Sequence, residues 1–285
     1  MREPLVSVIC LCYRHAGFIT AAVESVIHQT YKNVELIVVD DMSPDNSREV
    51  LASLQHKYPT MKVLLPPTNL GNCMAFNLGW SQSSGEYVID LAGDDVLMPE
   101  RIAEGVRALQ SSPANTGVQF TDAYIIDASG AVLGRHSDRY PHAGIPQGDV
   151  YEQVISSYFI CSPTMMIRRQ VLVTLGGYDE KLAYEDFDFW IRSARSYHYC
   201  YSPKPLVMKR VVKGSMGEQQ HRRGSSQLWS TLEVCKKILH LNRTLSEHKA
   251  LRGRIVYEAQ RAVKIGEFSL AWQYALLCRQ TFGRK

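Results

Sequence analysis

The chain has 285 residues and a net charge of +4, with 45% hydrophobic and 21% charged residues. These values match ordinary globular proteins, so they exclude disordered, collagen-like and low-complexity classes. No apolar stretch approaches the roughly 20 residues that a membrane-spanning helix needs. The first residues also lack a cleavable apolar segment. We therefore expect a soluble, cytoplasmic protein.

Charge is unevenly distributed along the chain. Residues 1–201 carry 15 Lys or Arg against 23 Asp or Glu, a net charge of −8, whereas residues 202–285 carry 17 against 5, a net charge of +12. Such a basic tail indicates an anionic partner surface, either membrane lipid or nucleic acid, or else a solvated helical face. The seven cysteines show no Cys-x-x-Cys pair and no spacing suited to zinc, so we expect buried, reduced thiols.

Strands and helices alternate in about the first 110 residues. An apolar run over 5–12 predicts a buried strand, and apolar residues repeating every four positions over 18–29 predict a helix. Parallel neighbours need a crossover that returns the chain to the same end, so this alternation predicts a parallel sheet covered on both faces. The further expected elements are a strand at 34–39, a turn at 40–45, a helix at 45–57, a strand at 61–65, a helix at 72–83, a strand at 86–91 and a helix after Pro99.

The second half of the chain is less regular. We expect a strand at 117–126, a turn at 127–130 and a loop at 135–148. Beyond 224 the pattern becomes helical, with two apolar stripes formed by Leu228, Leu232, Cys235 and Leu239 and by Leu270, Tyr274 and Leu277. The sequence thus predicts an α/β domain over 1–224 and a helical C-terminal appendage over 225–285.

Two acidic clusters follow predicted strands. Asp40 and Asp41 come directly after the strand at 34–39, where an open parallel sheet forms its ligand crevice. They can accept hydrogen bonds from a ribose or a base, or they can form a turn that caps the next helix. Asp94 and Asp95 follow the strand at 86–91, where a carboxylate can bind Mg or Mn or can cap a helix.

A third acidic cluster opens a predicted helix at Glu185 and Asp186. Phe187, Trp190 and Ile191 would form the buried face of this helix, which leaves both carboxylates in its first turn. The N-terminal end of a helix favours ionised carboxylates, and one beside a cleft can act as a general base. A simple helix cap is the alternative interpretation.

These clusters belong to an ordered series of motifs. In chain order the motifs are Val6-Ser7-Val8-Ile9, the stretch from Gln29 to Asp41, Asn69-Leu70-Gly71 with Asn77-Leu78-Gly79, Gly85-Glu86-Tyr87-Val88, Gly93-Asp94-Asp95, Gly176-Gly177-Tyr178-Asp179-Glu180 and Glu185-Asp186. Over roughly residues 5–216 this series resembles the family 2 glycosyltransferases. The tail beyond about 225 has no counterpart in these motifs.

The resemblance implies a GT-A nucleotide-binding fold, a nucleotide-sugar donor, a divalent cation (Mn or Mg) and inversion at the anomeric carbon. It implies that Tyr13 lies against the base, that Asp41 binds the uridine end and that Asp94 reaches the metal on the diphosphate. Asp186 would be the general base, with Glu185 as the neighbouring catalytic candidate. The implied donor-binding residues are Leu11, Tyr13, Arg14, Asp41, Gly71, Asn77, Asp94 and Asp95.

Three positions depart from the family's pattern. Ala92 replaces the first carboxylate of the Asp-x-Asp triplet, so a modest metal affinity is expected. Phe76 replaces an Arg, and Val212 replaces a His, which removes two expected contacts to the diphosphate. Lys213 and the arginines at 222–223 could supply positive charge instead.

The sequence therefore predicts an inverting glycosyltransferase that moves a sugar from a nucleotide sugar, expected to be a UDP-sugar, to a saccharide or lipid-linked acceptor. Two alternatives are a sugar-phosphate nucleotidyltransferase and a non-catalytic carbohydrate-binding relative. A nucleotidyltransferase would need a Gly-rich phosphate loop with basic residues after the first strand. Residues 12–17 contain one Gly and one Arg, which counts against this alternative. Acceptor recognition is expected to use 135–148 and the segment around 200–224.

The basic tail adds an expectation about location and partners. We expect no nucleic-acid partner. Instead the tail would dock the enzyme reversibly on an anionic membrane surface, at the inner membrane face. In the rival interpretation the apolar stripes pack on the catalytic domain and the charge faces water.

Overall fold

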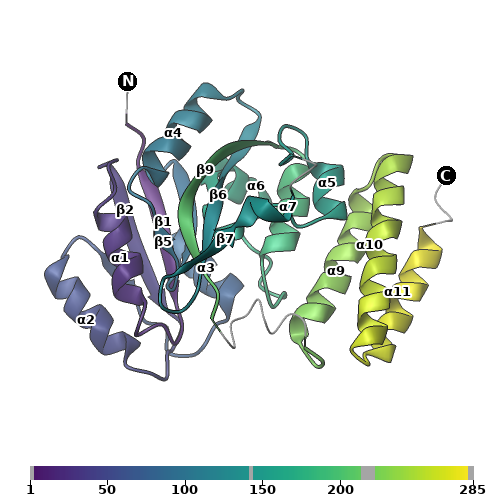
Figure 1. Ribbon diagram of the computed structural model, residues 1–285, viewed down its shortest axis with the longest axis horizontal. Helices are drawn as coiled ribbons and strands as arrows, with labels where there is room; N and C mark the ends of the chain where they lie inside the picture. Colours follow the sequence, from purple (N-terminus) through teal and green to yellow (C-terminus); the bar gives the residue numbers. More distant parts are fainter. Residues whose placement is uncertain (1–2, 141–143, 213–221, 282–285) are drawn as a thin grey trace.

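The computed structural model describes residues 3–140, 144–212 and 222–281 (Figure 1). Lys213, named above as a possible source of positive charge, lies outside the described residues. A central β-sheet is covered by helices on both faces, which confirms the predicted α/β class. In chain order the elements are β1 (Val6–Cys12), α1 (Ile19–Ile27), β2 (Val34–Asp40), α2 (Ser47–Lys57), β3 (Lys62–Leu64), α3 (Asn72–Ser81), β4 (Tyr87–Ala92), β5 (Val96–Leu97), α4 (Arg101–Ser111), β6 (Thr116–Ile126), β7 (Val132–Arg135), α5 (Tyr151–Ser156), β8 (Met166–Arg168), α6 (Arg169–Leu175), α7 (Asp186–Ala194), β9 (His198–Arg210), α9 (Ser226–Leu241), α10 (Leu245–Lys264) and α11 (Phe268–Gln280).

The sheet has a parallel half and a mixed half. Its strand order is β3-β2-β1-β4-β8-β6-β9-β5, and β7 pairs with β6 outside this path. The strands β1 to β4 are parallel to one another, as predicted. Next to them, β8 runs antiparallel to both β4 and β6, while β9 runs parallel to β6.

Alternating side chains of the strands build two apolar layers. Val8 and Cys10 of β1 point to one face, where α1, α2 and α4 cover them. Ile9 and Leu11 point to the other face, where α3, α5 and α7 cover them. Strands buried on both sides are typical of a parallel sheet, and this explains their nearly continuous apolar sequences.

The C-terminal helices form a layer beside the α/β domain. Figure 1 shows α9, α10 and α11 side by side, next to α5 and α7 and away from α1 and α2. Both predicted apolar stripes are buried and join the same hydrophobic cluster as the α3 face of the sheet. The stripes therefore pack inward. The boundary between domains 1–224 and 225–285 stays a prediction.

Within the described chain, no helix combines the length and the apolar character that crossing a bilayer requires. The seven cysteines form no disulfide, and five of them are buried, as expected.

The predicted loop at 135–148 is partly wrong. Its described residues begin at the end of β7 and include a 3-10 helix over His136–Arg139. Polar side chains build this turn: Asp138 accepts the Arg135 N–H at 2.7 Å, and Asp122 accepts the Ser137 N–H at 3.0 Å. Apolar periodicity cannot reveal a turn held in this way. Residues 141–143 of this loop lie outside the described residues. So do residues 213–221, which belong to the segment around 200–224 that is also expected to recognise the acceptor.

Candidate active site

The carboxyl ends of β1, β2 and β4 meet at one edge of the sheet. In the parallel register Cys12 pairs with Asp40, and β1 and β4 end within one residue of each other. The loops that follow therefore bring Tyr13, Asp41 and Asp94 to the same edge. This is where an open α/β sheet forms its ligand crevice.

The loop after β1 exposes an aromatic ring. Tyr13 keeps 44% of its surface exposed, so its ring can contact a base. Arg14 has a φ of 60°, in the left-handed region that residues other than Gly rarely adopt, and its N–H donates to Ser43 Oγ at 3.0 Å. Leu11 differs from both, because its side chain is buried in the core and its carbonyl oxygen accepts the Gly93 N–H at 2.7 Å. Leu11 therefore supports the edge from within.

Asp41 joins the end of β2 to the turn before α3. Its two carboxylate oxygens accept the N–H groups of Leu70 and Gly71, at 2.6 and 2.9 Å. Gly71 has a φ of +79°, which favours glycine at this turn. Asp41 is 7% exposed, and because each carboxylate oxygen has two lone pairs, each has the capacity for one more hydrogen bond. Asp40, by contrast, is fully buried and pairs with Arg48 at 2.9 Å.

Asn77 holds the segment after α6 against α3. Its Nδ2 donates to the Tyr178 carbonyl oxygen, and its Oδ1 accepts the Tyr178 N–H, both at 2.9 Å. A Cβ at Gly177 would lie 2.5 Å from Asn77 Oδ1, so glycine is required for this approach. The resemblance implies that Asn77 binds the donor. In the structure its side chain joins the motif on α3 to the motif after α6.

Phe76, which replaces the family's Arg, also contacts this segment. Its ring stacks on the ring of Tyr178 with a centroid distance of 4.1 Å and an interplanar angle of 22°. Phe76 is fully buried. In this chain, position 76 therefore supplies an aromatic contact that helps to hold the Tyr178 segment.

Asp94 and Asp95 point in different directions. Asp95 is buried and accepts the Arg210 N–H at 2.7 Å, and burial, followed by the charge of Asp94, raises its pKa to about 8. Arg210 Nε in turn donates to the Asp94 carbonyl oxygen at 2.9 Å. The side chain of Asp94 stays partly exposed, with its Oδ1 lying 3.9 Å from His15 Nε2. Asp95 thus anchors the turn to β9, and Asp94 remains accessible.

The donor set for a metal is small. Among the described residues, no three His, Cys, Asp or Glu side chains gather in a way that could hold a metal ion. Mg and Mn do not require such a cage, because they keep several waters and bind through one or two carboxylates and the substrate's phosphates. Asp94 fits this requirement as an accessible carboxylate. A metal would then be held jointly by Asp94 and the diphosphate.

The first turn of α7 places two carboxylates opposite α3. Glu185 precedes the helix, and Asn72, the first residue of α3, donates its Nδ2 to Glu185 Oε2. Burial, then the charges of Asp186 and Asp90, raise the pKa of Glu185 well above its usual value. Asp186 Oδ1 is shielded from water and has no hydrogen-bond partner among the described residues. One carboxylate oxygen of Asp186 is therefore not used in a hydrogen bond within the described part of the chain.

Asp90 is a member of this carboxylate group that sequence reasoning missed. It lies on β4 and accepts a hydrogen bond from the Tyr178 hydroxyl at 3.1 Å. Burial, with a further contribution from the charge of Asp186, raises its pKa to about 7 against the lowering effect of the Tyr178 hydroxyl. Alternation along β4 could have revealed it, because Asp90 shares a face with Val88, which packs on the side of α3 and α7.

Comparison with known proteins identifies the family of the chain. The sequence profile of glycosyl transferase family 2 matches residues 7–176. The chain belongs to this family. An uncharacterized glycosyltransferase of Nostoc sp. is 32% identical over 170 residues, which cover 59% of this chain and 52% of that protein. The chain spans between about half and two thirds of the length of the first curated relatives that it matches.

Solved structures share the fold. TarS residues 1–349 of S. aureus, in complex with UDP-GlcNAc, superpose with a TM-score of 0.70 at 18% identity, covering 91% of this chain and 73% of that one. The mannosyltransferase PcManGT of Pyrobaculum calidifontis, with GDP-Man and Mn2+, superposes with a TM-score of 0.66 at 16% identity, covering 99% and 81%. The likeness shows the fold, which is the predicted GT-A type.

Replacing Asp90 should make the free energy of unfolding less sensitive to pH. The folded protein keeps a proton on Asp90 up to about pH 7, whereas the unfolded chain releases it near pH 4. Between these two pH values the folded state binds more protons than the unfolded state. The contribution of this carboxyl to the free energy of unfolding therefore falls as the pH rises. The amide of Asp90→Asn can still accept a hydrogen bond from the Tyr178 hydroxyl. The free energy of unfolding of this variant, relative to wild type, should therefore increase from pH 5 to pH 7.

Denaturant unfolding at several pH values measures this effect. Glu152→Gln, an exposed change on α5, is the control for replacing a carboxyl group by an amide. Parallel pH curves for Asp90→Asn and wild type would contradict the raised pKa.

Proposed function

We propose that the protein is an inverting glycosyltransferase that moves a sugar from a nucleotide-sugar donor, expected to be a UDP-sugar, to a hydroxyl group of a saccharide or lipid-linked acceptor. The observation that carries this proposal is Asp186, whose Oδ1 is shielded yet unpartnered among the described residues at the first turn of α7. A carboxylate in that state can take a proton from an attacking hydroxyl.

The donor would bind at the edge formed by β1, β2 and β4. Tyr13 would contact the base, Asp41 the uridine end and Asp94 the metal on the diphosphate. The printed descriptions of the structural relatives, with UDP-GlcNAc in one and GDP-Man with Mn2+ in another, support a nucleotide-sugar donor and a divalent cation. The bound cation would neutralise charge that develops on the leaving diphosphate.

The acceptor side would be organised by α7. The acceptor hydroxyl attacks the anomeric carbon as the bond to the diphosphate breaks, and Asp186 receives the hydroxyl proton. One displacement from the face opposite the leaving group inverts the anomeric configuration. Glu185, bonded to Asn72, would keep Asp186 in place.

Asp94→Ala should abolish metal-dependent turnover, because it removes the partly exposed carboxylate of the turn after β4. Asp95 is already bonded to the backbone of β9. Turnover is measured as release of nucleoside diphosphate over a Mn titration, with Glu152→Ala on α5 as a control. Wild-type turnover with the same Mn dependence in Asp94→Ala would make the assignment wrong.

Asp186→Asn should lower kcat by roughly 10²- to 10⁴-fold, because the amide cannot accept the hydroxyl proton. Donor binding should stay nearly unchanged, since Asp186 lies outside the donor edge. Initial-rate kinetics and calorimetric titration of the donor separate the two effects. If Asp186→Asn transfers sugar at close to the wild-type rate, the role of base passes to another group, with Glu185 first.

The basic appendage would attach the enzyme reversibly to an anionic membrane surface. The apolar stripes of the appendage are buried, so they cannot serve this purpose. On α11, however, Phe268 and Trp272 are four residues apart and 69% and 60% exposed. Lys264 and Arg279 flank them in sequence. Exposed aromatic rings near basic groups are typical of interfacial membrane contacts.

Sedimentation with anionic and neutral vesicles tests this attachment. Wild type should sediment with anionic vesicles at low salt and be released at high salt, because each basic residue near the surface contributes about 1 kcal/mol. The double variant Phe268→Ser/Trp272→Ser should sediment less, whereas Val132→Ser/Leu133→Ser, which removes exposed apolar side chains on β7, should behave as wild type. Equal recovery of wild type in the supernatant with both lipids would exclude docking.

A further inference from the structure

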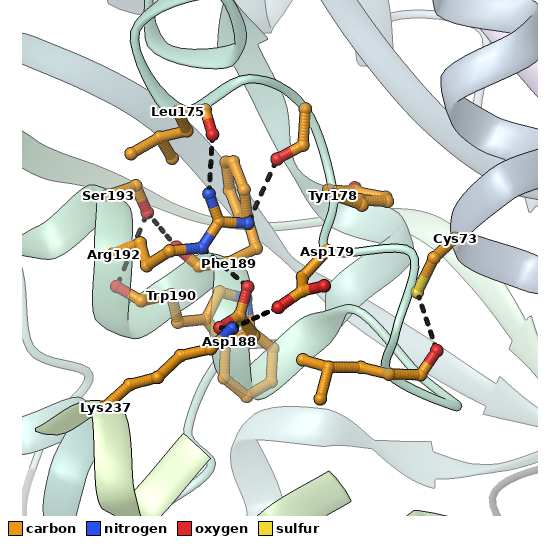
Figure 2. Close-up of polar contacts among 12 residues, drawn as sticks. Cys73, Leu175, Tyr178, Asp179, Asp188, Phe189, Trp190, Arg192, Ser193 and Lys237 are labelled. Atoms are coloured by element: carbon orange, nitrogen blue, oxygen red, sulfur yellow. Dashed lines mark hydrogen bonds and ion pairs between the residues drawn. The ribbon is translucent and has the colours of Figure 1, made fainter. Parts of the chain in front are cut away.

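Helix α9 reaches the segment that carries the proposed base. Figure 2 shows Lys237 of α9 pointing to two carboxylates, one on the segment after α6 and one on α7. Lys237 Nζ lies 2.5 Å from Asp179 Oδ2 and 2.5 Å from Asp188 Oδ1. The appendage thus forms an ion bridge to helix α7, at Asp188, two residues after Asp186.

Asp188 is buried and fully paired. Its side chain is 1% exposed, and its second oxygen accepts from Arg192 Nε at 2.6 Å. The other nitrogens of Arg192 donate to the carbonyl oxygens of Leu175 and Gly177, at 2.9 and 3.0 Å (Figure 2). A buried carboxylate is stable only when it is paired and hydrogen-bonded. Each oxygen of Asp188 has one cationic partner, and Lys237 is the partner that comes from another helix.

Two further side chains of α9 hold the residues just before the base. Ser230 Oγ accepts the Ala183 N–H at 2.9 Å, and Thr231 Oγ1 lies 2.8 Å from the Tyr184 hydroxyl. Together with Lys237, these contacts fix α9 to residues on both sides of Glu185 and Asp186. The appendage therefore restrains the segment that carries the carboxylate pair.

We propose that helix α9 positions the general base of this transferase and that Lys237 is the positioning residue. The proposal rests on the role proposed above for Asp186. Without Lys237, one oxygen of the buried Asp188 loses its cation, and Asp179 is released from α7. The first turn of α7 then has fewer restraints, and the orientation of Asp186 toward the acceptor hydroxyl is less well defined.

The effect should fall on the rate of transfer rather than on donor binding. Small displacements of a reacting group are costly in rate, whereas Tyr13, Asp41 and Asp94 lie on the loops after β1, β2 and β4. Lys237→Met keeps most of the side-chain volume and removes the charge. We expect it to lower kcat by about tenfold or more and to leave the donor KM within about twofold.

The chain offers a matched control one residue away. Among the residues that the structure describes, Lys236 pairs with Glu233 of the same helix, at 2.7 Å, and both side chains are about half exposed. Lys236→Met should keep wild-type kcat and KM. Lys237→Arg, which retains a cation at the bridge, should recover most of the kcat that Lys237→Met loses.

Hydrogen exchange of the amides over 179–190 gives a readout that needs no substrate. Lys237→Met should speed exchange in this segment while leaving β1, β2 and β4 unchanged, and Lys236→Met should change neither. If no nucleotide sugar is turned over by wild type, the proposed function fails, but the exchange result still tests the restraint. Equal kcat in the two Met variants, or faster exchange spread over the whole chain in Lys237→Met, would overturn the proposal.

Discussion

The parallel pairing of β1 with β2 and β4 is the constraint on which the candidate site depends. Parallel strands end at the same edge, so the loops after them converge only if this register holds. Cys12 lies beside Asp40, and Leu11 lies beside Ala92. A slip of one residue would turn the apolar side chains to the wrong face and separate the loops. The buried layers on both faces therefore also specify the site.

A second requirement concerns the carboxylates on α7. Asp188 and Asp186 are two residues apart, but their environments are opposite. Asp188 has a cation on each oxygen, whereas Asp186 keeps one oxygen without a partner among the described residues. Pairing Asp188 is consistent with a structural task, and leaving one oxygen of Asp186 unpaired is consistent with a chemical one. A helix held firmly at Asp188 can present Asp186 without using that carboxylate for its own stability.

The elements with regular patterns could be predicted from the sequence, whereas those that depend on distant contacts could not. The strands β1, β2 and β4 and the helices between them follow apolar periodicity and match the expected ranges within a few residues. The strand β9 was missed because Pro203 and Pro205 lie inside it. The structure accommodates them at shifts in register opposite Thr121 and Asp122, which local propensity does not reveal.

Site residues follow the same division. Asp41, Asp94 and Asp186 could be proposed because they stand at strand or helix ends within recognisable motifs. Lys237 could not, since its partners Asp179 and Asp188 lie 58 and 49 residues away in sequence. Asn77 was expected at the donor, yet its side chain bonds Tyr178, 101 residues away. Such side-chain pairings depend on how the helices pack, and a single sequence contains little information about that packing.

The role that we propose for the edge formed by β1, β2 and β4 is to bind a nucleotide sugar whose diphosphate leaves with the help of a divalent cation. The most direct measurement is nucleoside diphosphate release from a panel of UDP-, GDP- and TDP-sugars, with and without Mn. We expect release from at least one donor, highest for a UDP-sugar, and only when Mn is present. Absence of release from every donor, or formation of nucleoside triphosphate when pyrophosphate is added, would contradict it.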